Sequence, residues 1–273
     1  MPELPEVETI RKYLNKTILR KRIVNIKVFS KKQFPNNSEE IVGAKILSVK
    51  RRAKNLIIEL SNEKTLLIHL KLSGQLLWRP KTLNKTTRIV IVFDKGELVF
   101  NDLRKFGWIK ILNLDQLDLE LKKFGPEPFS KDFSIKYLQK VFKKSIRPVK
   151  TILLDQEKIA GIGNIYANEA LSEAEISPQK PVKALTIEEI KKLQKAILLV
   201  LKEGIKYNGA SAADKLYLKP DSSNGSYQQH FRIYQKNGEK CKKCNTIIER
   251  INLGGRGTFF CPKCQNMSRF RYI

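Results

Sequence analysis

The residue that follows the initiator methionine is the first candidate for chemistry. The chain opens with MPELPEVE, and a small second residue usually permits removal of Met1. Pro2 would then carry a free secondary amine, which titrates near a pH of about 8 and is partly neutral and nucleophilic at neutral pH. Attack on an aldehyde-like carbon would give an iminium ion. Glu3 would donate and accept protons beside it, and Glu6, one helical turn later, would hold the geometry or relay a proton.

The same residues also have an ordinary structural explanation. Prolines are tolerated in the first turn of a helix, where the missing N–H costs little. Acidic side chains in that turn complement the helix dipole. From the residues alone, a proline-rich helix start is therefore the simpler interpretation.

A second chemical pattern lies near the C-terminus. Two C-x2-C pairs are separated by sixteen residues, and their members are Cys241, Cys244, Cys261 and Cys264. This spacing is typical of a tetrahedral zinc site on a hairpin. Two disulfides are the alternative, but we expect thiols to stay reduced in a chain without a secretion signal. Four thiolates leave no position for water, so we expect one structural zinc ion, and no organic cofactor.

Charge narrows the class of partner. The 53 Lys and Arg residues against 27 Asp and Glu give a net charge of +26, and such a field attracts polyanions. Nucleic acid, an anionic membrane surface and an acidic protein all fit. No apolar run approaches the ~20 residues of a membrane span. We expect a cytoplasmic monomer that is not embedded in a membrane.

The elements that would position these residues change in type along the chain. Helical spacing of apolar residues predicts a helix over residues 2–19. Seven short β-branched runs follow between residues 22 and 113, one of them TLLIHLKLSGQLL, and Asp94-Lys95-Gly96 is a hairpin signal. This spacing favours a sandwich or flattened barrel.

Beyond a proline-rich segment the periodicity becomes helical. SKDFSIKYLQKVF and RPVKTILLDQ are expected helices, and TIEEIKKLQKAILLVLKEGIKYNG is a long one whose Thr186 and Glu189 fit a capping box. A loop rich in small residues spans 208–230, and the basic tail Arg269-Phe-Arg-Tyr272 is a solvated end. The expected domains are residues 1–123, a linker at 124–130, a helical domain at 131–230 and a zinc finger at 231–273.

Five blocks of sequence resemble the bacterial formamidopyrimidine-DNA glycosylases, which are bifunctional base-excision repair enzymes. They span nearly the whole chain in the expected order: PELPEVET at the N-terminus, Arg51-Arg-Ala-Lys54, Gly125-Pro-Glu-Pro128, Asp155-Gln156 with GIGNIYANE at 161–169, and Gly255-Arg-Gly-Thr258 inside the cysteine hairpin. The resemblance implies an α+β multidomain fold. Its parts are an N-terminal β-sandwich with an N-terminal helix, a helical domain with a helix–two-turn–helix motif, and a zinc-finger hairpin.

The resemblance also assigns catalytic roles. It implies that Pro2 attacks C1′ of the damaged nucleotide and expels the base through a Schiff base, while Glu3 protonates the sugar oxygen. Elimination at both flanking phosphates would then leave a one-nucleotide gap. Lys54, Asn164 and Arg256 match positions that hold the phosphates around the extruded nucleotide.

Extruding a base leaves a hole in the duplex that side chains must fill. In the family a methionine, an arginine and a phenylalanine do so, and Arg104 and Phe106 match the last two. Leu72 stands at the methionine position, where its similar volume should preserve wedging. As alternatives without this role, Arg104 would be a surface cation and Phe106 a core aromatic residue. His69 is interpreted as a satisfied core residue, not a ligand.

The implied partner is double-stranded DNA that contains oxidised bases or abasic sites. Endonuclease VIII-like relatives typically have glycine at the position of Leu4, so the oxidised-purine branch is favoured over the oxidised-pyrimidine branch. Two other hypotheses stay open: a non-catalytic DNA-binding module, in which Met1 is retained and the Pro2 nitrogen is an amide, and a zinc-ribbon protein of RNA metabolism. The second leaves PELPEVE and GIGNIYANE without a purpose.

Overall fold

The computed structural model describes residues 1–211 and 217–266, and the chain divides into two compact units. Unit 1 contains Met1–Lys123 together with Gly204–Gln228, and unit 2 contains Phe124–Glu203 together with the chain from Gln229 onward. The break after Lys123 coincides with the start of the proline-rich segment. The division places Gly204–Gln228 with unit 1, whereas the sequence pattern predicts that residues 131–230 form one helical domain. Among the described residues of this segment, Ala210 and Pro220 contact the N-terminal part of the chain. The tail 269–272 lies outside the described residues.

Unit 1 begins with the helix that the apolar spacing predicts. Helix α1 runs over Leu4–Thr17, two residues shorter at each end than predicted. Val7, Ile10 and Leu14 share one face of it and are fully buried. They join a core formed with both neighbouring sheets. Burial of this apolar face is what fixes the N-terminus of the chain on the strands.

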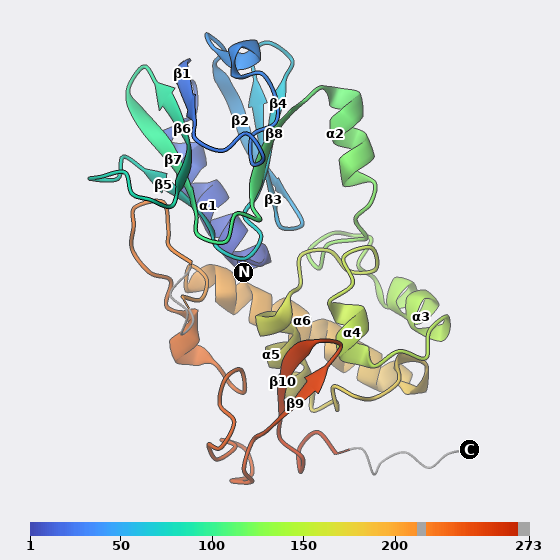
Figure 1. The fold of residues 1–273 in the computed structure, drawn as a ribbon. Coiled ribbons are helices and arrows are strands. Elements are labelled where there is room, and N and C mark those ends of the chain that lie inside the picture. Colours follow the sequence, from blue (N-terminus) through green and yellow to red (C-terminus); the bar gives the residue numbers. More distant parts are fainter. Residues whose placement is uncertain (212–216, 267–273) are drawn as a thin grey trace. The chain divides into compact units, whose positions relative to one another are not determined.

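Two four-stranded antiparallel sheets make up most of unit 1 (Figure 1). One has the order β1-β6-β7-β5 and the other the order β2-β3-β4-β8. The strands are β1 Ile23–Val28, β2 Ile46–Arg52, β3 Asn55–Leu60, β4 Thr65–His69, β5 Gly74–Trp78, β6 Thr87–Phe93, β7 Gly96–Asp102 and β8 Trp108–Leu112. The expected hairpin is present, since Phe93 pairs with Gly96 across the turn between β6 and β7.

One predicted strand was wrong. The sequence pattern predicts a single strand for TLLIHLKLSGQLL, but this segment forms β4 and β5, which belong to different sheets. The chain turns at Leu70–Ser73, where Lys71 has a left-handed φ of 50° and the Gly74 N–H closes the turn on the Leu70 carbonyl at 2.9 Å. This turn contains no proline and its glycine comes only at the end, so it lacks the ordinary sequence signals of a turn.

The remaining elements of unit 1 are short. The 3-10 helix η1 spans Ser38–Ile41, and helix α2, which the periodicity did not predict, spans Leu114–Leu121. A capping box between Asn113 and Gln116 starts α2. Pro220 belongs to the part of unit 1 that follows α6 in the chain. Its carbonyl accepts the N–H of Trp78, in the edge strand β5, at 2.7 Å.

Unit 2 is helical, with one small hairpin. Its elements are α3 Ile135–Lys143, α4 Val149–Leu153, α5 Asn164–Ala174, η2 Val182–Ala184, α6 Ile187–Lys206, η3 Tyr227–His230, β9 Glu249–Leu253 and β10 Arg256–Phe260; the ends of α6 and η3 cross the division between the units. The predicted capping box at Thr186 and Glu189 is present at α6. Ser134 caps α3, four residues later than the serine at which the helix was expected to open. None of the described helices is both long and apolar enough to cross a lipid bilayer.

Candidate active site

The first turn of α1 buries the predicted catalytic residues. Pro2, Glu3 and Glu6 are all buried, with 2% of Glu3 and 1% of Glu6 exposed. The Glu3 N–H donates to Glu6 Oε2 at 2.8 Å, and the two residues form a capping box. Buried carboxylates need such partners, because removing a charge from water is costly. Glu6 thereby fixes the backbone of Glu3 beside the nitrogen of Pro2.

A distant segment supplies the second contact to Glu6. The Ala210 N–H donates to Glu6 Oε1 at 2.8 Å, across a separation of 204 residues. Gly209 precedes it with a φ of +80°, and a Cβ atom there would lie 2.8 Å from Glu6 Cγ. Glycine is therefore required at position 209, both for its conformation and for its closeness to the carboxylate. No sequence motif predicted this contact.

Tyr217 closes the same corner of unit 1. Its side chain is buried, its hydroxyl donates to the Asn208 carbonyl at 3.1 Å, and its main-chain carbonyl accepts from the Ser211 hydroxyl at 2.8 Å. Burial raises the pKa of the Tyr217 phenol well above its usual range, and the nearby charge of Glu6 raises it further by a smaller amount. Tyr217 therefore stays protonated and can serve as a donor to the backbone.

Lys54 sits in the turn between β2 and β3. Arg52 pairs with Asn55 across that turn, Ala53 has a left-handed φ of 55°, and only 5% of Lys54 is exposed. Arg51 braces the strand by donating to Glu8 of α1 at 3.1 Å. The RRAK segment is thus held against the helix that carries Pro2 and Glu3.

His69 is a structural residue at the end of β4, in agreement with the sequence interpretation. Its Nδ1 accepts the Lys71 N–H at 2.9 Å. The pKa of His69 is lowered to about 3. Burial is the largest cause, and the positive charges of Lys71 and Lys54 contribute in the same direction. The ring is therefore neutral at physiological pH and keeps its acceptor.

The three predicted wedge residues lie on two turns of unit 1. Leu72 is half-buried in the β4–β5 turn, while Arg104 and Phe106 are exposed in the β7–β8 turn. The Arg104 guanidinium lies 5.4 Å from the centre of the Phe106 ring. With 55% of its surface exposed, Phe106 is not the core aromatic residue of the alternative interpretation.

In unit 2 the helix–two-turn–helix motif consists of α4, a glycine-containing turn and α5. Gln156 holds the turn, since its side chain donates to the Leu154 and Ile162 carbonyls and accepts the Gly161 N–H at 2.9 Å. Asn164 is the first residue of α5, and its Nδ2 donates to the Gly257 carbonyl at 3.1 Å. The predicted phosphate ligand Asn164 therefore touches the residue next to Arg256.

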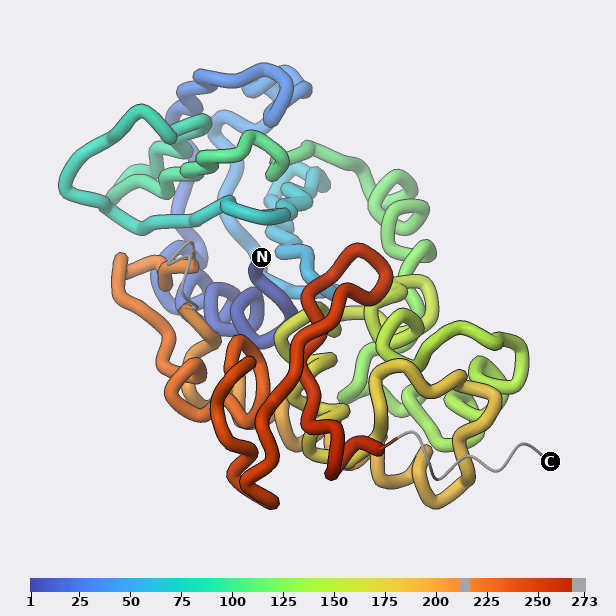
Figure 2. Tube along the Cα trace, turned by 60° about the horizontal axis from the view of Figure 1, so that its bottom comes forward, coloured from blue at the N-terminus to red at the C-terminus, as the bar shows by residue number. Residues whose placement is uncertain are grey.

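A buried lysine supports the same hairpin. Lys150 of α4 is fully buried, and its Nζ lies 2.9 Å from the Gly257 carbonyl and 2.6 Å from Thr258 Oγ1. Asn168 adds another contact, because its Oδ1 accepts the Phe259 N–H at 2.9 Å. Figures 1 and 2 show the hairpin β9–β10 beside α5. These contacts fix strand β10, at whose start Arg256 is exposed.

Glu169 anchors the chain that leads into the cysteine hairpin. Its carboxylate is fully buried and accepts the N–H groups of Arg232, Ile233 and Tyr234 at 2.8, 3.0 and 2.9 Å. Burial raises the pKa of Glu169, opposed by these donors and by the charge of Arg232. Glu169 closes the GIGNIYANE motif, but no role was predicted for it from the sequence.

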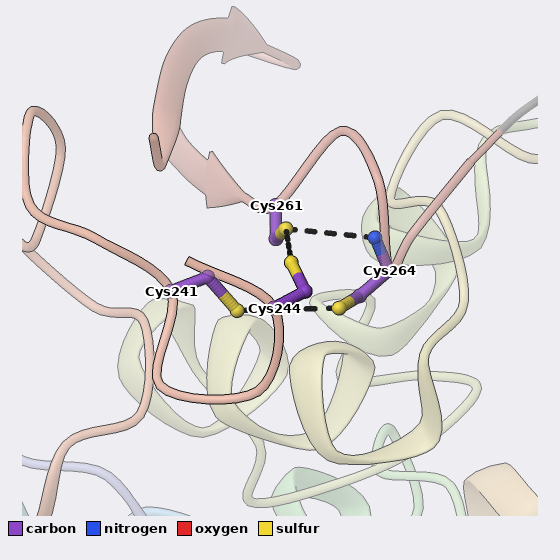
Figure 3. Close-up of side chains that lie close together, drawn as sticks. All are labelled: Cys241, Cys244, Cys261 and Cys264. Carbon is purple, nitrogen blue, oxygen red and sulfur yellow. Dashed lines mark hydrogen bonds between the residues drawn. The ribbon is translucent and has the colours of Figure 1, made fainter. Parts of the chain in front are cut away.

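The four cysteines come together as a metal site (Figure 3). Their sulfurs all lie within 4.8 Å of one another, with Cys244 and Cys261 at 3.4 Å and Cys241 and Cys264 at 4.0 Å. A tetrahedral zinc ion with Zn–S bonds of about 2.3 Å needs sulfurs about 3.8 Å apart, so the geometry fits. Hydrogen bonds from Thr246 lower the pKa of Cys244 to about 6, which favours its thiolate. The four sulfurs could together hold one zinc ion, and a set of four thiolates leaves no position for water on it.

A groove of about 520 Å³ lies between α4 and the tip of the hairpin. Its lining includes Arg147, Thr151, Gly254 and Arg256. Arg147 is paired with Asp155 at 2.9 Å. The exposed guanidinium of Arg256 and the neighbouring main chain give this face the chemistry of a phosphate site.

Each unit therefore assembles part of the predicted site. Unit 1 brings together Pro2, Glu3 and Glu6 and carries Lys54 and the wedge residues. Unit 2 brings Asn164 against the hairpin of Arg256 and gathers the cysteines. Unit 1 thus has a buried carboxyl group beside the nitrogen of Pro2, and unit 2 has a cationic and an amide side chain at one hairpin.

Comparison with known proteins matches both units. The chain matches family models for the formamidopyrimidine-DNA glycosylase N-terminal domain over residues 1–109, the H2TH domain of the same enzymes over 124–215, and a zinc finger found in FPG and IleRS over 238–266. A formamidopyrimidine-DNA glycosylase of Carboxydothermus hydrogenoformans is 42% identical over 97% of this chain and all of its own.

Solved structures agree with the sequence match. The MutM (Fpg) protein of Thermus thermophilus has a TM-score of 0.90 and 36% identity, and covers 97% of this chain and 98% of its own. Lactococcus lactis Fpg in complex with DNA containing an oxidized pyrimidine has a TM-score of 0.89 and 35% identity, over 97% and 100% of the two chains. A variant of that protein bound to Fapy-dG DNA has a TM-score of 0.91, with the same identity and coverage. This chain belongs to the formamidopyrimidine-DNA glycosylase family.

Proposed function

We propose that this chain is a bifunctional DNA glycosylase and AP lyase that removes oxidised purines, such as 8-oxoguanine and formamidopyrimidines, from duplex DNA. The observation that carries the proposal is the first turn of α1. Pro2 and Glu3 are buried together there, and Glu6 is fixed between the N–H groups of Glu3 and Ala210. Such fixation suits proton transfer, which requires a carboxyl group within hydrogen-bond reach of its target.

The reaction uses the Pro2 nitrogen as nucleophile after removal of Met1. Its lone pair forms a bond to C1′ of the damaged nucleotide, and the bond from C1′ to the base breaks, so that the base leaves with the bonding electrons. The Pro2 nitrogen gives up its own proton to the departing base and so regains a lone pair. Glu3 gives a proton to the sugar ring oxygen, the ring opens, and an iminium ion forms between Pro2 and C1′. This cation acidifies the C2′ proton, whose loss expels the 3′ phosphate. A second elimination expels the 5′ phosphate.

The cationic and amide side chains hold the DNA during these steps. Lys54, Asn164 and Arg256 bind phosphates around the extruded nucleotide. Leu72, Arg104 and Phe106 fill the space that the base leaves in the duplex. Through this binding the protein would be associated with the nucleoid.

A second substrate class is an oxidised pyrimidine. The structure of the Lactococcus lactis relative was solved with DNA that contains an oxidised pyrimidine, and that structure resembles this chain with a TM-score of 0.89. We therefore include an oxidised pyrimidine lesion as the second duplex to be tested.

Borohydride trapping tests the proposal directly. Duplex DNA with one 8-oxoguanine opposite cytosine is incubated with the protein and borohydride, and the covalent band is digested to locate the adduct by mass. We expect an adduct on Pro2 in molecules that lack Met1. Molecules that retain Met1 in the same sample are the internal control, because their Pro2 nitrogen is an amide. Tight duplex binding by processed protein without an adduct on either lesion would overturn the enzymatic assignment in favour of a damage-binding protein.

A further inference from the structure

The two turns that carry the wedge residues are adjacent because of strand pairing. The β4–β5 turn, residues 70–73, and the β7–β8 turn, residues 103–107, each cross from one sheet to the other. Strand β5 pairs with β7, which places Gly74 opposite Asp102. Strand β4 pairs with β8, which places His69 opposite Trp108. The turns therefore begin and end at paired positions.

One buried carboxylate contacts both turns. Asp102 is fully buried. Its Oδ1 accepts the Ser73 hydroxyl at 2.5 Å and the Arg104 N–H at 3.2 Å. Its Oδ2 accepts the Gly107 N–H at 2.7 Å and the Gln33 side-chain amide at 3.0 Å. Ser73 Oγ also accepts the Arg104 N–H at 2.9 Å, so the two turns share a single network.

Both turns need such support because their backbones are unfavourable on their own. Lys71 and Lys105 have left-handed φ angles of 50° and 58°, which residues other than glycine adopt only when the surroundings impose them. A Cβ atom at Gly107 would lie 2.7 Å from the Phe100 ring and 3.1 Å from Asp102 Oδ2. The Gly107 N–H can therefore approach the carboxylate only as glycine.

We infer that Asp102 is a positioning residue that joins the two turns into one rigid wedge, so that Leu72 enters the duplex together with Arg104 and Phe106. This inference rests on the proposed function, in which those three side chains fill the space left by the extruded base. A carboxylate is the right group for the task because it only accepts hydrogen bonds, and four donors surround it. An amide of the same size would turn an NH₂ group toward at least one of those donors.

The main test compares Asp102→Asn with Asp94→Asn, the same change at an exposed aspartate in the β6–β7 turn. In Asp102→Asn at least one buried donor loses its acceptor. We therefore expect this variant to excise 8-oxoguanine from duplex DNA about 10- to 100-fold more slowly than the wild type in single-turnover experiments. Cleavage of a pre-formed abasic site in single-stranded DNA needs no wedge, so it should change less than about twofold. The Asp94 variant should match the wild type in both assays.

Two further measurements separate positioning from general damage to the fold. A 2-aminopurine next to the lesion brightens when the stack opens, and we expect this signal to be slower in Asp102→Asn. Leu72→Ala should reduce the excision rate by a smaller factor in the Asp102→Asn background than in the wild type, because the two turns are already uncoupled there. Ser73→Ala removes the two contacts of the Ser73 hydroxyl, with Asp102 Oδ1 and with the Arg104 N–H. The other three donors of Asp102 remain, so this variant should show the same pattern to a smaller degree if Asp102→Asn fails to fold.

The outcomes distinguish this inference from the proposed function. A wild-type protein that excises neither lesion contradicts the proposed function itself. An active wild type with an equally active Asp102→Asn variant overturns the inference alone. So do strictly additive effects of Leu72→Ala and Asp102→Asn, or an equal loss of single-stranded cleavage and duplex excision.

Discussion

The first turn of α1 and the cysteine hairpin are held in place by different means. The α1 turn rests on the large apolar core of unit 1, where Val7, Ile10 and Leu14 are fully buried. The hairpin has a small apolar cluster in which Ile233, Ile248 and Phe259 pack with the four cysteines. It depends on side chains of α4 and α5 and on the metal. Small modules commonly need a metal because they bury too little apolar surface. Catalysis and DNA binding should therefore be separable by substitution.

The largest expected effect is at Glu3. Glu3→Gln keeps the size and the acceptor of the side chain but removes its proton transfer, so base excision should fall by about 10²- to 10⁴-fold. Affinity for a duplex with an abasic-site analogue should stay within about twofold. Single-turnover kinetics and fluorescence anisotropy measure the two quantities. Glu39→Gln, an exposed site in η1, is the control, and an equal loss of affinity in Glu3→Gln would contradict the proposed separation.

Loss of the zinc ion should have the opposite effect. Cys261→Ser, or removal of the metal with a chelator, should weaken binding to the same duplex by at least about 100-fold, because the site holds the hairpin that carries Arg256. Unit 1 should stay folded. Tight binding by the metal-free protein would show that the polar contacts of α4 and α5 suffice.

The chain offers a clean probe for this experiment. Both tryptophans, Trp78 in β5 and Trp108 in β8, belong to unit 1. Tryptophan fluorescence during urea unfolding therefore reports on unit 1 alone. We expect the same midpoint with and without zinc, whereas an earlier transition would show that the units are not independently stable.

A smaller effect is expected at Lys150. Lys150→Met keeps the length and the burial of the side chain but removes both contacts to the hairpin at Gly257 and Thr258. The half-buried Gly257 carbonyl loses the lysine donor and keeps that of Asn164, and the buried Thr258 hydroxyl loses the lysine donor as well. The cost should be about 1–3 kcal/mol, or about 5- to 150-fold in affinity if the hairpin shifts. Lys202→Met at an exposed position of α6 removes the same charge. Equal affinity losses in the two variants would mean that only the net charge matters.

Local patterns predicted some parts of the molecule and long-range contacts decided others. Each C-x2-C pair and the Thr186 capping box act over a few residues, so the sequence alone reveals them. The split between β4 and β5 depends on a left-handed Lys71 that tertiary contacts impose. Residues 204–228 join unit 1 through contacts such as that of Ala210 with Glu6, which no local signal encodes.

The difference between local patterns and long-range contacts also explains which residues of the candidate site the sequence does not predict. The spacing of the cysteines predicts their clustering by itself, whereas Pro2 and Glu3 are candidates only through the resemblance of PELPEVET to a family signature. Lys150 and Asp102 were passed over because lysine and aspartate are ordinarily exposed. Their full burial shows up only in the folded chain, where each satisfies main-chain groups of a turn or hairpin.

The smallest expected effect is a change in the pH dependence of unit 1. His69 takes up a proton near pH 6.5 when the chain is unfolded but only near pH 3 when it is folded. Between these values the unfolded state binds more protons, so the free energy of unfolding should fall as the pH falls from about 6.5, by up to about 1.4 kcal/mol per pH unit. The full stabilising contribution of neutral His69 to the free energy of unfolding is therefore present above about pH 6.5.

His69→Asn isolates this contribution, because asparagine keeps an acceptor for the Lys71 N–H but does not titrate. Urea unfolding followed by tryptophan fluorescence at pH 7, 6 and 5 (about one pH unit apart) should show a shallower loss of stability than in the wild type. His230→Asn removes the only other histidine of the chain, which is exposed in η3, and should keep the wild-type slope. Because the comparison uses slopes, a lower overall stability of the His69 variant does not affect it. Parallel slopes in the wild type and His69→Asn would mean that His69 has the same pKa in the folded and the unfolded chain. The Lys71 N–H would then need another acceptor at a pH below that value.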